Sequence, residues 1–443
     1  MTGQWIEQKD LYMLKFSLWG KLLALCLALV LTACGGGKGS SADAPTGFTV
    51  TPGNGQVTVT WNAQPGVDYW LMYAPTATPI DIANPPLHNW ATSITSPYVV
   101  SLYNSAALVN GTVYSFAMNA RTGGGPGGAQ TASVSATPGY AGTTWVTGTG
   151  AAGTLNGVTF GTSSADSQNY FAAFGDGGVI YKAAYGVSQG LTGYVWSQVM
   201  GGPVADFKAT TYASSYGKFF AVGANGGANN IVSTSDFSNW TAATVLPASA
   251  SAGLNAVTSY GTTLMAVGNS GTVLYSVDGA TWNAASVAGA YAGSNFYGVT
   301  YSASNGMWVA VGANGALITS STGTSWTSGT SNAGANDLLG VTATSGNVVV
   351  AVGAGGTVVR SLDGGLTWAL QTSLPAITLY GISTDSTQFV AVGTGGAEFT
   401  SLDGATWTLA ATPGTSANLK AVTGSASLYM AVGVTGATVS SIH

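Results

Sequence analysis

LNAVTSYGTTLMAVGNSGTVLYSVDGATW, residues 254–282, is one copy of a sequence unit that recurs through the C-terminal part of the chain. Each copy contains a small residue, then Val or Phe, then a glycine, and these glycines are Gly175, Gly223, Gly268, Gly312, Gly353, Gly393 and Gly433. Six copies end at a tryptophan: Trp196, Trp240, Trp282, Trp326, Trp368 and Trp407. The glycines lie 40–48 residues apart, and each copy holds four short apolar runs separated by turn residues. Runs of this length and composition predict four β-strands per copy.

The two ends of the repeat region complement each other. The last copy stops at Ser441-Ile442-His443, before its tryptophan, whereas Thr143-Thr144-Trp145 supplies such an ending at the other end. An outer strand taken from the N-terminal side would complete the last copy and remove the open sheet edges. An open solenoid would need polar caps at both ends. The sequence therefore predicts an all-β chain whose residues 141–443 form a seven-bladed β-propeller, closed by the strand at Trp145.

Three turns between the third and fourth strands carry a shared motif. It contains Ser, Asp, Gly, Thr and Trp, with the aspartate and tryptophan at Asp278 and Trp282, Asp363 and Trp368, Asp403 and Trp407. These turns resemble the Asp-box of sialidase-type propellers, although only the turn ending at Trp368 has the full spacing. Its DGG-x-TW run also resembles the propellers of photosystem II assembly factors. We expect each aspartate to accept backbone N–H bonds and each tryptophan to pack the outer strand, so both are interpreted as structural.

Residues 44–138 form a separate region of short alternating strands. Trp61 and the stretch 108–116, LVNGTVYSF, resemble the core tryptophan and the Leu-x-x-Gly-Thr-x-Tyr-x-Phe motif of fibronectin type III domains. The resemblance implies a two-sheet sandwich in which the Tyr114 hydroxyl is bonded to the backbone just upstream. We interpret this domain as a spacer.

The N-terminal segment is typical of an export signal. Lys15 and Lys21 precede or border the ten-residue apolar run 22–31, which is too short to span a membrane. The run ends in Leu-Thr-Ala-Cys34, which resembles the lipobox of bacterial lipoproteins. The resemblance implies a signal peptide over 1–34, acylation of Cys34 and anchoring in a lipid bilayer. Glu7 and Asp10 precede the basic residues, which is atypical of such a signal, so we expect translation to start at Met13. Gly35 follows the cysteine, which in that family implies the outer membrane of an exported, envelope-anchored protein, and 35–43 reads as a flexible tether.

Scarce residue types exclude several kinds of site. Histidine occurs only at His88 and His443, and cysteine only at Cys26 and Cys34, so we expect no metal site and no cofactor. A net charge of −5 makes nucleic acid an unsuitable partner. Arg360 is the one arginine of the repeat region, whereas sialidases hold their substrate with three. We expect a monomer without sialidase activity.

Two function classes remain. A hydrolase of another Asp-box type would need two facing carboxylates, and the candidates are Asp166, Asp176, Asp206, Asp337, Asp385 and Glu398. A binding module is the favoured hypothesis, with no catalytic residue assigned. The second residue of each first strand varies between uniform neighbours, and around the ring it reads Asn156, Lys208, Asn255, Tyr297, Leu339, Tyr380 and Lys420. We expect these side chains, Leu339 excepted, to contact a protein or glycan ligand at one mouth of the channel.

Overall fold

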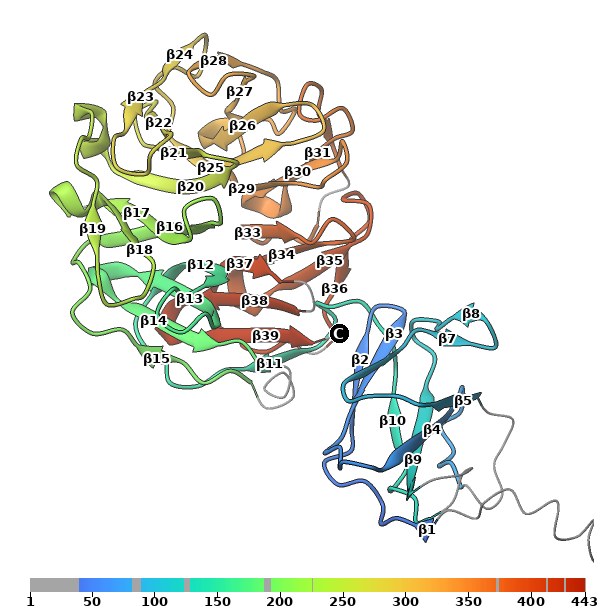
Figure 1. Ribbon diagram of the computed structural model, residues 1–443. Coiled ribbons are helices and arrows are strands. Elements are labelled where there is room, and N and C mark those ends of the chain that lie inside the picture. The colour runs from blue at the N-terminus through green and yellow to red at the C-terminus, as the bar shows by residue number, and fades with distance from the viewer. Residues whose placement is uncertain are drawn as a thin grey trace, which may run out of the picture. The chain divides into compact units, whose positions relative to one another are not determined.

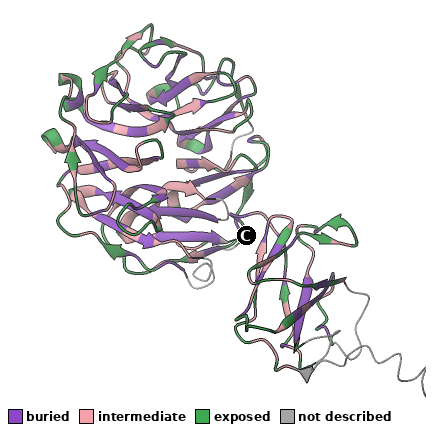
Figure 2. Cartoon of the chain, in the orientation of Figure 1, coloured by how far each residue is buried: buried purple, intermediate pink, exposed green. Residues whose placement is uncertain are grey.

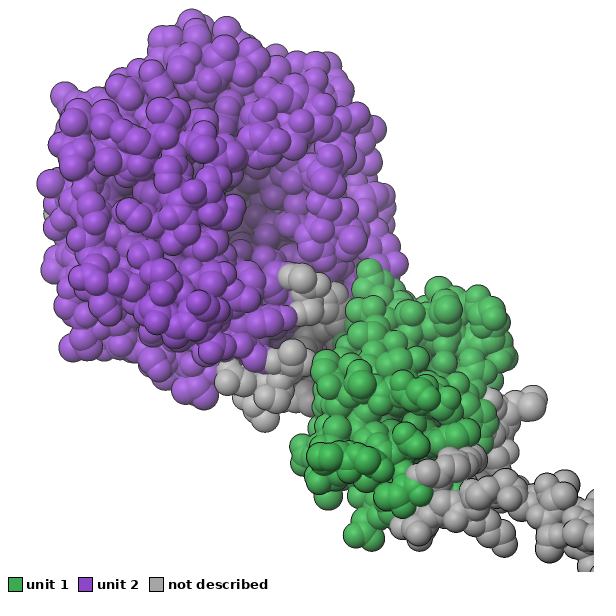
Figure 3. All heavy atoms as spheres, viewed as in Figure 1, with its two compact units in different colours: residues 1–138 green, residues 139–443 purple. Residues whose placement is uncertain are grey.

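The computed structural model describes residues 40–81, 89–122, 128–186, 193–224, 226–371, 374–411, 413–425 and 428–442. The predicted signal peptide and the lipidation site Cys34 lie outside the described residues. The chain divides into two compact units, Met1–Pro138 and Gly139–His443 (Figure 3). Each unit has its own core and is described separately.

Unit 1 is a sandwich of two antiparallel sheets with a small hairpin. One sheet contains β1 (Ser40–Ser41), β4 (Asp68–Ala74), β5 (Asn89–Thr92), β9 (Tyr114–Thr122) and β10 (Val134–Ala136). The other contains β2 (Thr49–Gly53), β3 (Gln56–Thr60) and β6 (Tyr98–Val100), and the hairpin is β7 (Leu102–Tyr103) with β8 (Ala106–Ala107). Strand β1 pairs with β9, so the end of the segment predicted to be a free tether is part of a sheet.

Alternating apolar residues build the core of unit 1. Val57 and Val59 on β3 are fully buried, and Trp61 packs in the same core. The Tyr114 hydroxyl accepts a hydrogen bond of 3.1 Å from the backbone N–H of Val109, five residues upstream. This is the bond that the resemblance implied, while membership of the fibronectin type III family stays a prediction.

The described part of unit 2 contains seven sheets, numbered here as blades 1–7, whose strands pair antiparallel except for one added strand of blade 4, which pairs parallel. Blade 1 consists of β12 (Leu155–Thr162), β13 (Asn169–Gly175), β14 (Ile180–Ala184) and β15 (Ser197–Gln198). Blade 2 consists of β16 (Asp206–Ala213), β17 (Lys218–Ala224), β18 (Ile231–Thr234) and β19 (Thr241–Ala242). Blade 3 consists of β20 (Leu254–Tyr260), β21 (Thr263–Gly268), β22 (Val273–Ser276) and β23 (Asn283–Ala284). Blade 4 consists of β25 (Phe296–Ser302), β26 (Met307–Gly312), β27 (Leu317–Ser320) and β28 (Ser325–Ser328), with β24 (Ser286–Ala288) added beside β28. Blade 5 consists of β29 (Leu338–Ala343), β30 (Val349–Gly353), β31 (Val358–Ser361) and β32 (Ala369–Leu370). Blade 6 consists of β33 (Leu379–Thr384), β34 (Phe389–Gly393), β35 (Glu398–Ser401) and β36 (Thr408–Leu409). Blade 7 consists of β37 (Leu419–Gly424), β38 (Leu428–Gly433), β39 (Thr438–Ile442) and β11 (Trp145–Thr147).

Short 3₁₀ turns connect strands of unit 2. They are η1 (Asp176–Gly178), η3 (Gly227–Asn230), η4 (Ala248–Ala252), η5 (Ala313–Gly315), η6 (Ala354–Gly356), η7 (Thr394–Gly396) and η8 (Val434–Gly436). Six of them, η1, η3, η5, η6, η7 and η8, each lie between the second and third strands of a blade.

The first strands of the blades contact one another in a circle, in the order β12, β16, β20, β25, β29, β33, β37 and back to β12 (Figure 1). Each second strand is covered on both faces by neighbouring blades, so its residues form a continuous apolar run instead of an alternating one. All five residues of β30 are buried, for example, and purple marks these strands in Figure 2. The unit is a β-propeller.

The two ends of unit 2 meet in blade 7. Strand β11 pairs antiparallel with β39, with Trp145 opposite Ser441 and Thr147 opposite Val439. The N–H of Gly142 donates to the Ser441 hydroxyl, and the Trp145 indole N–H donates to the Gly142 carbonyl at 3.0 Å. The same two bonds join Ser361, Gly365 and Trp368 within one turn of blade 5. The turn of blade 7 is therefore assembled from residues at opposite ends of the propeller.

Candidate functional site

The seven variable ring positions share one backbone feature. In the first strand of every blade the pairing register shifts at this position, for example between Leu155 and Gly157 and between Leu379 and Gly381. The residues left without a paired partner are Asn156, Lys208, Asn255, Tyr297, Leu339, Tyr380 and Lys420. A β-bulge redirects the side chain of its extra residue and commonly occurs beside binding sites. The bulges explain how one position per blade escapes the regular packing of the strands.

These seven side chains line one cavity of about 230 Å³, together with the residues that follow them in the first strands. Figure 3 shows the hollow near the centre of unit 2. Each ring residue is half-buried. No carboxylate is among the described residues that line this cavity.

The small residue after each ring position has a packing reason. A Cβ atom on Gly381 would lie 3.1 Å from the Ala421 Cα and 3.2 Å from the Lys420 carbonyl oxygen. The first strands of adjacent blades thus approach backbone to backbone, and a larger side chain would separate them. This constraint fixes the neighbours of the ring position while leaving the ring position itself free to vary.

Blades 1–3 hold their ring side chains in hydrogen bonds. Lys208 Nζ lies 2.7 Å from Asp176 Oδ1, and Asn156 Nδ2 donates to the same oxygen at 2.8 Å. Asn255 Nδ2 donates to Asn269 Oδ1 and to the Phe296 carbonyl, both at 2.9 Å. These three side chains are therefore positioned before any ligand arrives, and Asp176 offsets the charge of Lys208.

The opposite arc of the ring has a different character. Lys420 Nζ lies 3.6 Å from the centroid of the Tyr380 ring, which is a cation–π contact between blades 7 and 6. In the described part of the chain no carboxylate oxygen lies within 4.0 Å of Lys420 Nζ. Tyr297 and Leu339 add aromatic and aliphatic surface between the two arcs. The cavity thus offers cationic, aromatic and amide groups to a ligand.

The carboxylates considered for hydrolysis have partners elsewhere in the fold. Asp206 Oδ1 accepts the N–H of Gly177 at 2.9 Å, and Asp337 Oδ1 accepts the N–H of Asn314 at 2.8 Å, so both connect adjacent blades. Asp166 accepts a hydrogen bond from the Tyr170 hydroxyl, and Asp176 forms the ion pair with Lys208. Asp385 accepts the backbone N–H of Thr387, and Glu398 accepts that of Gly414. None of the six lines the channel cavity, and the structure brings no two of them together in that cavity.

The turn aspartates accept hydrogen bonds from their own turns. Asp363 Oδ1 accepts the N–H groups of Leu366 and Thr367 at 3.1 and 2.9 Å. In blade 3, backbone hydrogen bonds from Thr281 and Ala280 lower the pKa of Asp278 to about 2. Asp403 accepts the corresponding pair from Thr406 and Ala405, both at 2.8 Å. These bonds give the aspartates a role in forming the turn.

Blade 2 contains an equivalent turn that the sequence motif did not reveal. Asp236 Oδ1 accepts the N–H groups of Ser238 and Asn239 at 2.9 and 2.7 Å, and Thr234 takes the place of the usual serine. Phe237 occupies the glycine position with a φ of 62°. A bulky residue is rare in this conformation. Its ring is buried against Phe219 and Tyr170, which compensates for the backbone strain.

We predict that Asp363→Ala lowers the free energy of unfolding by about 1–3 kcal/mol, because two turn N–H groups lose their acceptor. Asp363→Asn keeps an oxygen for these bonds and is the matched control. Trp368→Ala removes a buried indole and should cost more, about 3–5 kcal/mol. Urea melts of the three variants measure the difference, and a larger loss for the aspartate than for the tryptophan would show that the structural interpretation is wrong.

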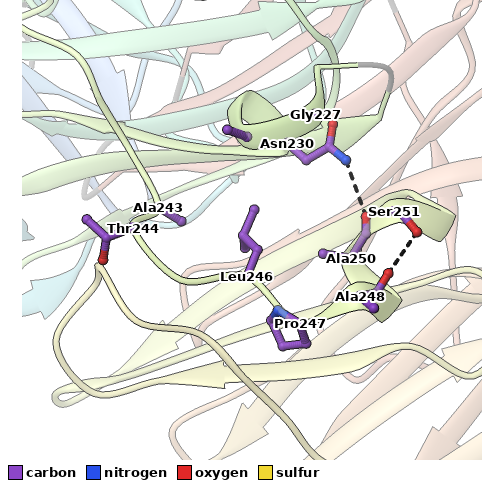
Figure 4. Close-up of a pocket in the computed structure, with 10 residues that line it drawn as sticks. Gly227, Asn230, Ala243, Thr244, Leu246, Pro247, Ala248, Ala250 and Ser251 are labelled. Carbon is purple, nitrogen blue, oxygen red and sulfur yellow. Dashed lines mark hydrogen bonds between the residues drawn. The ribbon is translucent and has the colours of Figure 1, made fainter.

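A second cavity, of about 520 Å³, lies on blade 2 between η3, η4 and the segment 243–247 (Figure 4). Asn230 Nδ2 donates to the Ala250 carbonyl at 3.2 Å, and the Ser251 hydroxyl donates to the Ala248 carbonyl at 2.7 Å. Among the described residues that line it, none has a titratable side chain. This cavity lacks groups for acid–base chemistry, and its polar side chains are already engaged, since the Thr244 hydroxyl also donates to a carbonyl, that of Ala280, at 3.2 Å.

The described residues contain neither a metal-binding cluster nor a membrane-spanning helix. Among them, no group of three or more His, Cys, Asp and Glu side chains is placed to hold a metal ion. The same residues include no helix that is long and apolar enough to cross a membrane.

Comparisons with known proteins identify the fold of unit 2. No protein-family model matches the chain, and no curated protein matches it. Similar solved structures include YCF48 bound to a D1 peptide, with 16% identity, 68% of this chain and 94% of that chain covered, and a TM-score of 0.50. Another is a virginiamycin B lyase from Staphylococcus aureus with quinupristin, which is 12% identical, with 68% of this chain and 98% of that chain covered and a TM-score of 0.54. A third is the WD40 propeller domain of Doa1, which is 8% identical, with 67% of this chain and 95% of that chain covered and a TM-score of 0.50. These likenesses show that the chain contains a β-propeller.

Proposed function

We propose that the propeller is a binding module that takes a protein or glycan partner at the channel mouth. One observation carries this proposal: the variable residue of every blade is a bulged residue, and all seven side chains line one cavity. The cavity combines two lysines, two tyrosines and two asparagines, with no carboxylate among the described residues that line it. This composition suits recognition better than two-carboxylate hydrolysis. YCF48, whose fold is similar, has been seen with a bound peptide, which is compatible with a protein partner.

We further propose that the protein is exported and anchored in the cell envelope, at the outer membrane, through acylated Cys34. Unit 1 would then serve as a spacer between the lipid anchor and the propeller. The support for this part is the lipobox-like run ending at Cys34. In this arrangement the propeller would act as a scaffold or receptor and not as an enzyme.

The mouth proposal predicts that Lys208→Ala, Tyr297→Ala, Tyr380→Ala and Lys420→Ala together abolish partner recovery. The chain from residue 35 onward would be used to pull down partners from an envelope extract and to probe a glycan array. A matched control replaces two lysines and two tyrosines outside the cavity, namely Lys182, Lys218, Tyr185 and Tyr260.

Equal recovery of partners by the mouth variant and the wild-type protein would contradict the proposal. Turnover of a glycoside that disappeared on replacement of one propeller carboxylate would instead favour the hydrolase alternative.

A further inference from the structure

We propose that a separate cavity on blade 6 binds an organic cation, an alkylammonium or guanidinium group, at a site independent of the channel mouth. This cavity, called the side pocket, has a volume of about 460 Å³. It lies between the turn and outer strand of blade 6 and the segment that precedes β11. Its lining includes Tyr140, Gln388, Leu402 and Asp403, together with four threonines.

The first observation is a buried hydrogen-bond acceptor without a donor. Gln388 is 2% exposed and lines the side pocket. Its Nε2 donates to the Ala141 carbonyl at 2.8 Å, and since a carbonyl can only accept, this bond fixes which end of the amide is nitrogen. Its Oε1 is buried and has no hydrogen-bond partner among the described residues. A ligand N–H would satisfy this oxygen.

The second observation is a carboxylate with one oxygen available. Asp403 Oδ1 is occupied by the turn N–H groups of Ala405 and Thr406, whereas no hydrogen bond to Oδ2 is recorded from the described residues. Asp403 is exposed, and its turn hydrogen bonds oppose the effect of burial so that the pKa of its carboxyl is lowered. The side chain is therefore an anion at neutral pH, as a partner for a cation must be.

No lysine or arginine is among the described residues that line the side pocket. The cation that acts on Asp403 is Arg360 of blade 5, which lies behind Gly404: a Cβ on Gly404 would be 3.7 Å from Arg360 Cδ. No Arg360 nitrogen is within 4.0 Å of an Asp403 oxygen among the described contacts. Arg360 partly offsets the negative charge of the Asp403 carboxylate but does not line the side pocket.

The lining fits a cation better than an anion or an apolar ligand. It provides one buried acceptor without a donor, Gln388 Oε1, and one exposed anionic group, the Asp403 carboxylate. The aromatic ring of Tyr140 can face a cation. Residues 139–443 contain ten Asp and Glu residues against five Lys and Arg residues, a net charge of −5 that attracts cationic ligands. The threonine methyl groups and Leu402 would contact an alkyl chain leading to the charged group.

The experiment measures binding to the chain from residue 35 onward by calorimetry. The probes are N-acetyl-arginine amide and N-acetyl-lysine amide, with the citrulline and norleucine amides as neutral controls of matching shape. A tripeptide with a central arginine distinguishes the two sources of such a cation: tighter binding than the single residue indicates a basic peptide, and equal binding indicates a small amine.

The variants are Gln388→Met, which removes the unpaired oxygen, and Asp403→Asn, which keeps an acceptor for the turn. Each is expected to weaken binding of the cationic probes at least tenfold. Asp278→Asn, the same change in blade 3, and Lys420→Ala at the channel mouth are expected to leave this binding unchanged. Circular dichroism melts check that all variants are folded.

Three results would overturn the proposal: no saturable binding of the cationic probes, equal binding of the neutral controls, or unchanged binding in Gln388→Met and Asp403→Asn. Because Lys420→Ala affects the channel mouth alone, failure of this proposal is distinguishable from failure of the proposed function.

Discussion

Trp145→Ala is expected to lower the free energy of unfolding by about 3–5 kcal/mol from lost packing alone, and by more than the same change at Trp368. The Trp145 indole is 3% exposed and packs with Val439, Tyr429 and Val390 of blades 7 and 6. Its strand β11 pairs with β39 of blade 7. The chain that connects these two strands runs around the whole propeller, so the pairing joins its two ends. Loss of Trp145 would therefore also weaken the pairing that joins the two ends.

The control is Trp368→Ala, since Trp368 makes the same indole bond to a glycine carbonyl within a continuous turn. Urea melts give the two stabilities, and amide hydrogen exchange reports the pairing of β39. Faster exchange of β39 amides is expected in Trp145→Ala and not in Trp368→Ala. Equal stability losses with unchanged exchange at β39 would show that β11 contributes packing but does not hold the ends together.

Much of the propeller was predictable because its sequence repeats. The second strands are apolar without interruption, and the turns carry the same Ser, Asp, Gly and Trp at similar spacing, so each copy supports the interpretation of the others. The missing tryptophan of the last copy indicated where the outer strand would come from, and the structure pairs Trp145 with Ser441. The completion of that turn by the Ser441 hydroxyl was not anticipated, because it joins residues about 300 positions apart.

The candidate site was predictable in position but not in its contacts. Variation between fixed neighbours indicated which residues would share the channel, and the structure places all seven in one cavity. The bulge could not be inferred, since a one-residue register shift leaves no compositional signal. The ion pair of Lys208 with Asp176 also depends on a turn in the adjacent blade. The irregular turn of blade 2 was missed because Phe237 stands where the motif requires glycine.

Glu398 is the residue whose role the sequence could least indicate. It was considered only as a candidate catalytic carboxylate, yet it is fully buried on β35. Its Oε1 accepts a long bond of 3.4 Å from the Gly414 N–H, and its Oε2 has no partner among the described residues. Gly414 packs against Val439 and Trp145, so the carboxyl group lies close to where β11 meets β39.

Burial raises the pKa of Glu398 from 4.5 to about 8, and the Gly414 bond offsets only part of this effect. The folded protein thus retains a proton that the unfolded chain releases above pH 4.5. The contribution of protonated Glu398 to the free energy of unfolding is fully present below pH 4.5 and is lost as the pH rises towards about 8. At about 1.4 kcal/mol per pKa unit, the loss is on the order of 5 kcal/mol.

Glu398→Gln is therefore expected to leave stability at pH 4.5 nearly unchanged and to raise it by a few kcal/mol at pH 9, on the order of the loss given above. The neutral amide has the size of the protonated acid and cannot ionise, so the destabilisation between the two pH values should disappear. Urea melts of the wild type and the variant at half-unit intervals from pH 4.5 to 9 measure this. Asp385→Asn, a change to a half-buried turn carboxylate, controls for altered net charge. Parallel pH profiles for Glu398→Gln and the wild type would mean that the buried carboxyl group does not govern the alkaline stability of the propeller.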